Sequence, residues 1–160
     1  MSRGTGSATP PDQAGRAPWP LRFSLAVCLL LLLQYLLGMA ANLYVVLPAR
    51  HPGAGAGSYF TGVTAGLGWL IPQGPAWAAA HAALGLALVL VALGGVAIAW
   101  RQHHRLATAL SVLGALAIIG AGFNGASFLN YGHAFSSMIM AGLWVLGLAC
   151  YLAGALLAGR

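Results

Sequence analysis

Residues 77–123 read WAAAHAALGLALVLVALGGVAIAWRQHHRLATALSVLGALAIIGAGF, two long apolar runs joined by the basic turn RQHHR at residues 101–105. Neither run contains Asp, Glu, Lys or Arg. A helix needs about 20 residues to cross a hydrocarbon layer of roughly 30 Å. This stretch therefore predicts two antiparallel transmembrane helices, at residues 77–100 and 106–123.

Two further apolar runs without charged residues, 23–47 and 134–157, flank this hairpin. Strands are excluded because open sheet edges leave backbone groups unpaired in lipid, and because these runs lack the alternation of a barrel. Residues 21–160 are therefore predicted to be all-α: a polytopic membrane protein built as a four-transmembrane-helix bundle, with the lipid bilayer as its first partner.

The composition excludes most catalytic chemistry. The chain is 60% hydrophobic and 5% charged, with a mean hydropathy of +0.85, whereas a soluble domain carries roughly a quarter charged residues. All seven basic residues are arginines, and the only acidic residue is Asp12. Paired-carboxylate hydrolases, carboxylate metal sites and aspartate-driven proton pumps are thereby ruled out. We predict no catalytic residues and expect a binder rather than a catalyst.

The arginines predict the orientation. With an even number of spans, the N-terminal arginines, the turn at residues 101–105 and Arg160 share one side, and Arg50 is alone on the other. The positive-inside rule then places both termini in the cytoplasm, with the protein in the cell membrane. The net charge of +6 follows from this topology and from attraction to anionic headgroups, so no nucleic-acid partner is predicted.

Two segments lie outside the predicted helices. Residues 1–20 are rich in Gly, Ser, Thr and Pro and predict a disordered cytoplasmic tail. A cleaved signal peptide ending near residues 38–40 is the alternative, but the apolar run continues to residue 47, too far for such a peptide. The glycine-rich loop 48–76 predicts a lid over the outer face, with a short interfacial or re-entrant segment around residues 59–71.

Histidines carry the main cofactor hypothesis. His81 and His133 fall near the outer ends of the second and fourth predicted helices, where two imidazoles can ligate the iron of a b-type haem. Gly85, one turn from His81, leaves space for the macrocycle, and Met138 is an alternative axial ligand. The competing interpretation is a histidine bonded to a nearby asparagine or backbone carbonyl. The other histidines, His51, His103 and His104, are expected in solvent.

A polar outer cluster follows the third apolar run. Glycines and Asn124 after residue 120 predict the end of that helix near residue 123, with a crossing of roughly ten residues to the fourth helix. Asn124, Asn130 and Tyr131 lie in this crossing, and Asn42 is expected at a similar depth. These side chains either cap helix ends or line a ligand pocket.

The layout resembles one four-helix half of haem A synthase, in which histidines at the outer ends of the second and fourth helices of each half ligate haem. This resemblance implies haem contacts for His81 and His133. The chain departs from that family in having no glutamate, so haem A synthesis itself is rejected. The segments at residues 124–131 and 136–140 are also similar to those of small uncharacterised four-helix membrane proteins of high-GC bacteria.

Three functions are compatible with these sequence features. The first is a non-catalytic accessory or binding protein that associates with other membrane subunits or with copies of itself. The second is a b-type haem protein for electron transfer or haem handling. The third, an oligomeric transporter or channel, is disfavoured because the helices lack charged pathway residues.

Overall fold

The computed structural model describes residues 18–159, and all regular secondary structure among them is helical. The five helices are α1 (Trp19–Tyr44), α2 (Tyr59–Gln73), α3 (Ala76–Arg101), α4 (Arg105–Tyr131) and α5 (Ala134–Ala158). Four of them, all except α2, are long and apolar enough to cross a membrane. The prediction of an all-α chain with four such helices is thereby confirmed. Most of the predicted tail, residues 1–17, lies outside the described part.

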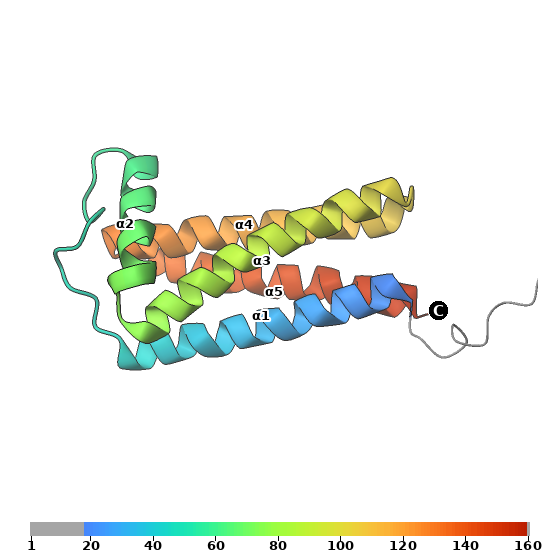
Figure 1. Ribbon diagram of the computed structural model, residues 1–160, viewed down its shortest axis with the longest axis horizontal. Coiled ribbons are helices and arrows are strands. Elements are labelled where there is room, and N and C mark those ends of the chain that lie inside the picture. The colour runs from blue at the N-terminus through green and yellow to red at the C-terminus, as the bar shows by residue number, and fades with distance from the viewer. Residues whose placement is uncertain (1–17, 160) are drawn as a thin grey trace, which may run out of the picture.

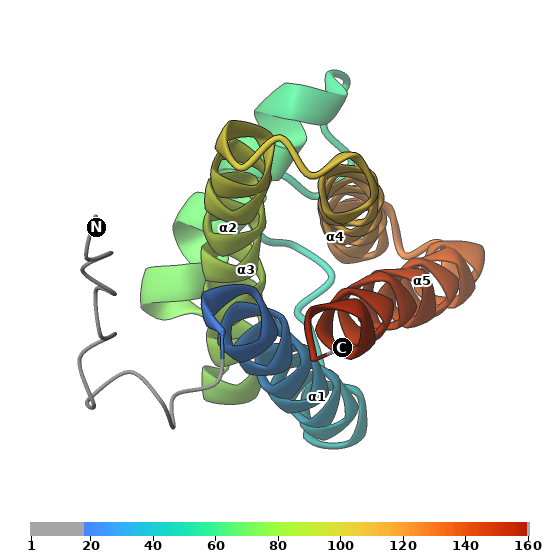
Figure 2. The same ribbon diagram turned by 90° about the vertical axis from the view of Figure 1, so that its right-hand side faces the viewer.

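The four long helices form a bundle with a simple neighbour order. Each packs against two others, in the ring α1, α3, α4, α5, whereas α2 packs on α3 and α4 (Figures 1 and 2). Figure 1 shows α2 lying across one end of the bundle, and the tight α3–α4 turn at the opposite end. We call these the α2 end and the turn end. The start of α1 and the end of α5 lie at the turn end (Figure 1).

The core fills the middle of the bundle. Val27 and Leu31 of α1 and Leu88 and Ala92 of α3 are almost fully buried, and they join buried residues of α1, α4 and α5: Cys28, Ala115, Ile118 and Tyr151. Large apolar side chains also point outward from every long helix, for example Leu90, which is 66% exposed. A core that mixes large apolar and small residues, with large apolar side chains also on the outside, is expected of helices that pack in lipid.

The prediction that the third long helix ends near residue 123 is wrong. Helix α4 continues to Tyr131, and Gly132 ends it in the left-handed conformation, with its N–H bonded to the Phe128 carbonyl (3.0 Å). The Asn124 amide donates back to the Gly120 carbonyl of its own helix (2.9 Å), so it does not stop the helix. Gly120 and Gly125 instead let α5 approach closely, since an added Cβ would lie 3.0 and 3.3 Å from atoms of Leu143 and Met140.

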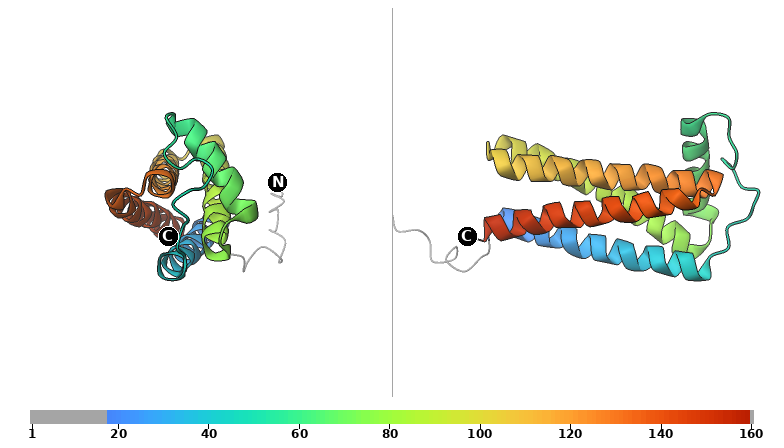
Figure 3. Two further views of the ribbon diagram at one scale, coloured as in Figure 1. Left: turned by 90° about the vertical axis from the view of Figure 1, so that its left-hand side faces the viewer. Right: turned by 180° about the vertical axis from the view of Figure 1, so that it is seen from behind.

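The predicted loop 48–76 contains a regular helix, α2, which covers the expected short segment at residues 59–71. Figure 3 shows α2 and the preceding chain at the end of the bundle. One stripe of α2 is buried, Gly62, Gly66 and Leu70, at the spacing of four that places residues on one helix face. The two glycines allow the backbone of α2 to lie directly on α4.

Candidate functional site

His81 is held between α3 and α1 by Gln34. Its Nδ1 lies 3.1 Å from the Gln34 carbonyl oxygen, so this nitrogen carries the proton and donates it. Its Nε2 accepts from the Gln34 side-chain amide (3.3 Å), which also donates to the His81 carbonyl (3.1 Å). Three hydrogen bonds thus join two helices through one pair of residues. The interpretation of His81 as a histidine bonded to a backbone carbonyl agrees with this geometry.

Two glycines make room for this pair. An added Cβ on Gly38 of α1 would lie 2.9 Å from His81 Cε1, and one on Gly85 of α3 would lie 3.0 Å from Gln34 Nε2. Each long side chain therefore packs over a glycine of the facing helix. Gly85, predicted to leave space for a macrocycle, leaves space for Gln34. We call residues 34, 38, 81 and 85 the Gln–His pair site.

The arrangement does not fit a haem. A haem ligand needs a free ring nitrogen and a second ligand across the macrocycle, but both ring nitrogens of His81 already face Gln34. His133 is exposed and stacks on Tyr131, and Met138 is 63% exposed on α5. No Cα atom of α3 lies within 8 Å of a Cα atom of α5 among the described residues. The structure places His81 and Gly85 at the Gln–His pair site, and His133 and Met138 on the exposed surface at the start of α5.

A second polar site lies at the α2 end, around Asn130. This residue, in the last turn of α4, is 5% exposed, and neither atom of its amide has a hydrogen-bond partner among the described residues. Its amide is enclosed by Gly53, Gly62 and Gly66, whose added Cβ atoms would lie 2.7 to 3.3 Å from it. Any larger residue at Gly66 would collide with the Asn130 oxygen at 2.7 Å.

Hydrogen bonds fasten the segment before α2 and its first turn to α4. The Gly55 N–H donates to the Asn130 carbonyl (3.0 Å), and the Tyr131 hydroxyl donates to the Ala56 carbonyl (3.1 Å). The Tyr59 hydroxyl donates to the Phe123 carbonyl (2.6 Å). We call residues 45–58 together with α2 the α2 cap. It is a docked part of the fold, because its backbone and side chains bond directly to α4.

His51 was expected in solvent, and this expectation is wrong. Its Nε2 lies 3.1 Å from the Leu129 carbonyl oxygen and its Nδ1 lies 3.0 Å from the Pro52 carbonyl oxygen, while its ring stacks on Trp69 of α2 at 5.1 Å between centroids. It therefore bridges α2 and α4. No local signal in the sequence marks this role, because Leu129 is distant in the chain.

The predicted polar outer cluster separates into three parts. Asn130 and Tyr131 contact the α2 cap, and Asn124 bonds to its own helix. Asn42 is exposed on α1, and no hydrogen bond within residues 18–159 joins it to Asn124 or Asn130. Between the cap and the end of α4 lies an open hollow of about 600 Å³, whose lining includes Leu47, His51, Phe128 and Tyr131.

No family model, curated protein or solved structure matches this chain. The resemblance to haem A synthase therefore stays a prediction based on helix layout.

Proposed function

We propose that this protein is a multi-pass protein of the cell membrane that acts as a non-catalytic accessory or binding protein. The observation that carries the proposal is the outward-facing apolar surface of all four long helices, with large exposed side chains such as Leu36, Leu90, Leu116 and Leu156. Soluble monomers rarely expose apolar patches beyond a few hundred Å². Lipid or the apolar faces of other membrane proteins are the surroundings that suit such a surface.

The arginine distribution supports an orientation with both termini in the cytoplasm. Among the described residues, Arg22, Arg101 and Arg105 lie at the turn end, and Arg50 lies in the segment leading to α2. Excess arginine marks the cytoplasmic side of short membrane loops. The α2 cap then faces the outer side.

Binding is favoured over catalysis by how the polar side chains are used. His81 and Gln34 bond to each other, His51 bonds to α4, and Tyr59 bonds to the Phe123 carbonyl. A general base or nucleophile needs its ring nitrogen or hydroxyl within reach of a reacting atom of a substrate. In this chain the polar side chains named above bond to other parts of the protein and hold helices together.

Photo-crosslinking in cell membranes tests the accessory role. A photoreactive residue would replace Leu36, Leu90, Leu116 or Leu152, each exposed on a different long helix, with the almost fully buried Leu88 as the matched control. An accessory subunit gives a discrete protein adduct from one side of the bundle and none from position 88. Lipid adducts alone, from every exposed position, would contradict the accessory role.

The haem alternative has a direct spectroscopic test. The protein purified in mild detergent after expression with haem supplied is expected to show no Soret band and no sharp bands after dithionite reduction. A Soret band lost in His81→Ala and kept in Gln34→Ala would establish the haem function and contradict the assignment of His81 to the Gln–His pair site.

A further inference from the structure

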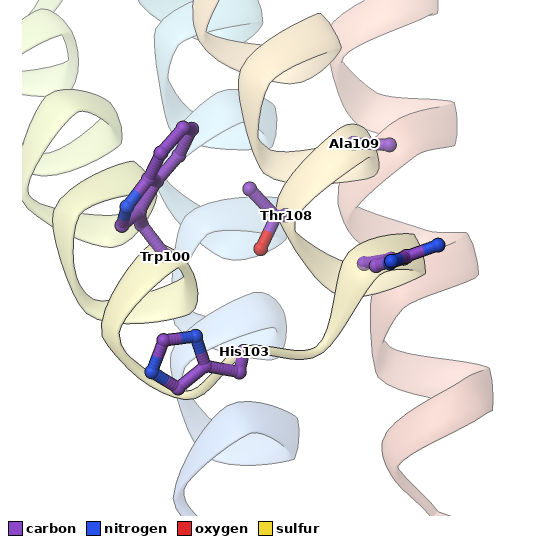
Figure 4. A pocket seen from close by; sticks show the side chains of 5 residues that line it. Trp100, His103, Thr108 and Ala109 are labelled. Atoms are coloured by element: carbon purple, nitrogen blue, oxygen red, sulfur yellow. The ribbon is translucent and has the colours of Figure 1, made fainter.

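A second hollow, of about 720 Å³, lies at the turn end between the end of α3 and the start of α4. It is lined by Trp100, His103, Arg105, Thr108 and Ala109. Figure 4 shows the rings of Trp100 and His103 beside the first turns of α4, where Thr108 and Ala109 lie. Neither the Gln–His pair site nor the α2 cap uses any of these residues.

The positive charge of the arginines around this turn-end hollow has no acidic counter-ion within the described chain. Arg101, His103, His104 and Arg105 follow one another closely, and the only acidic residue, Asp12, lies outside residues 18–159. The first turn of α4 adds the positive end of a helix dipole. A cluster of this kind attracts an anion.

His103 adopts a backbone conformation that a histidine rarely takes. Its φ is +54°, and it is the only non-glycine residue with positive φ among residues 18–159; the others are Gly53, Gly55 and Gly132. Glycine adopts this conformation without the strain that a side chain brings.

Two donors at this hollow, the His103 ring and the Arg105 guanidinium, remain available to a ligand. The Thr108 hydroxyl donates to the His104 carbonyl (3.1 Å), and His104 Nδ1 accepts from the Ala107 N–H (3.5 Å). No hydrogen bond of the His103 ring or the Arg105 guanidinium occurs within the described residues. Arginine is a usual partner of phosphate oxygens, and an imidazole N–H can donate a hydrogen bond to one as well.

We propose that this hollow binds the phosphate of an anionic phospholipid headgroup, with Arg105 and His103 as its donors. A lipid is favoured over a free phosphate because the hollow adjoins exposed apolar surface: Trp100 is 69% exposed, and Leu106 is exposed at the start of α4. Tryptophan is enriched at the headgroup level of membranes, and basic pockets between helices bind lipid headgroups there. The inference rests on the membrane location proposed above.

Native mass spectrometry of the full chain in mild detergent tests this site, with added phosphatidylglycerol compared with phosphatidylcholine. Wild-type protein is expected to bind phosphatidylglycerol more tightly. Arg105→Gln is expected to weaken that binding about fivefold, the effect of one cation near an anionic lipid. Arg50→Gln, which removes a charge far from the hollow, is the matched control and is expected to bind like wild type.

His103→Gly separates binding from folding. The substitution relieves the strained φ, so the variant is expected to unfold at the same or a higher temperature while binding phosphatidylglycerol more weakly.

Unchanged binding in this variant, equal binding of the two lipids by wild type, or equal weakening by Arg50→Gln would each overturn the site. Inorganic phosphate that alone stabilises the protein as much as phosphatidylglycerol does would overturn the lipid assignment. Failure of the membrane proposal is distinguishable, because alkaline carbonate would then release the chain from membranes.

Discussion

Replacing Gly38 by alanine tests the packing of α1 against α3 at the Gln–His pair site. The added Cβ would lie 2.9 Å from His81 Cε1 and 3.2 Å from Nδ1. Carbon atoms in favourable contact are at least about 3.5 Å apart, so the ring would have to retreat from α1 by about 0.6 Å. Its bond to the Gln34 carbonyl, now 3.1 Å, would lengthen to about 3.7 Å and be lost.

The expected loss of stability for Gly38→Ala follows from three contributions. Overpacking costs about 1–3 kcal/mol, and losing a hydrogen bond between membrane helices adds about 0.6 kcal/mol. The better helix propensity of alanine offsets at most about 1 kcal/mol. We therefore expect the free energy of unfolding to fall by about 1–3 kcal/mol.

Unfolding of the purified protein in detergent, followed by circular dichroism, measures this loss. Gly94→Ala in α3 is the matched control, because an added Cβ there meets no atom within 4 Å. In the double variant Gly38→Ala/His81→Ala the clash is absent, so adding Gly38→Ala to His81→Ala should cost little. Gly38→Ala alone as stable as wild type would show that the packing of His81 does not require glycine at position 38.

Two further predictions concern the α2 cap. Gly66→Ala places a Cβ 2.7 Å from Asn130 Oδ1 and is expected to loosen the cap, seen as faster hydrogen exchange in residues 45–58; Gly68→Ala, with open space around it, should leave exchange unchanged. Tyr59→Phe removes the 2.6 Å bond to the Phe123 carbonyl and is expected to lower the free energy of unfolding by about 1 kcal/mol in the same denaturation assay. A Tyr59→Phe protein as stable as wild type would show that this bond does not hold the cap.

Hydropathy predicted the long helices well because apolar length is a property of each segment alone. The end of α4 was predicted too early, because the glycines and asparagine at residues 120–125 resemble a helix stop. In this bundle Gly120 and Gly125 serve close packing against α5, and Asn124 bonds back to its own helix. A glycine inside an apolar run can therefore mark a helix contact as well as a helix end.

The sites were less predictable because their partners are far apart in the chain. His81 was identified from its position, yet its partner Gln34 lies 47 residues away, and only the rotation of two helices brings them together. His51 likewise contacts Leu129, 78 residues away, through a segment with no regular pattern. A single sequence contains no measure of such pairings.

The proposed function depends most on a chain that crosses the membrane four times with the turn end inside. Gln102→Cys in the α3–α4 turn and Gly57→Cys in the α2 cap place one exposed thiol at each end, while the native Cys28 and Cys150 are buried. An impermeant maleimide added to intact cells is predicted to label position 57 at once and position 102 only after the membrane is opened. Labelling of position 102 in intact cells, or equal labelling of both positions, would contradict the proposed topology.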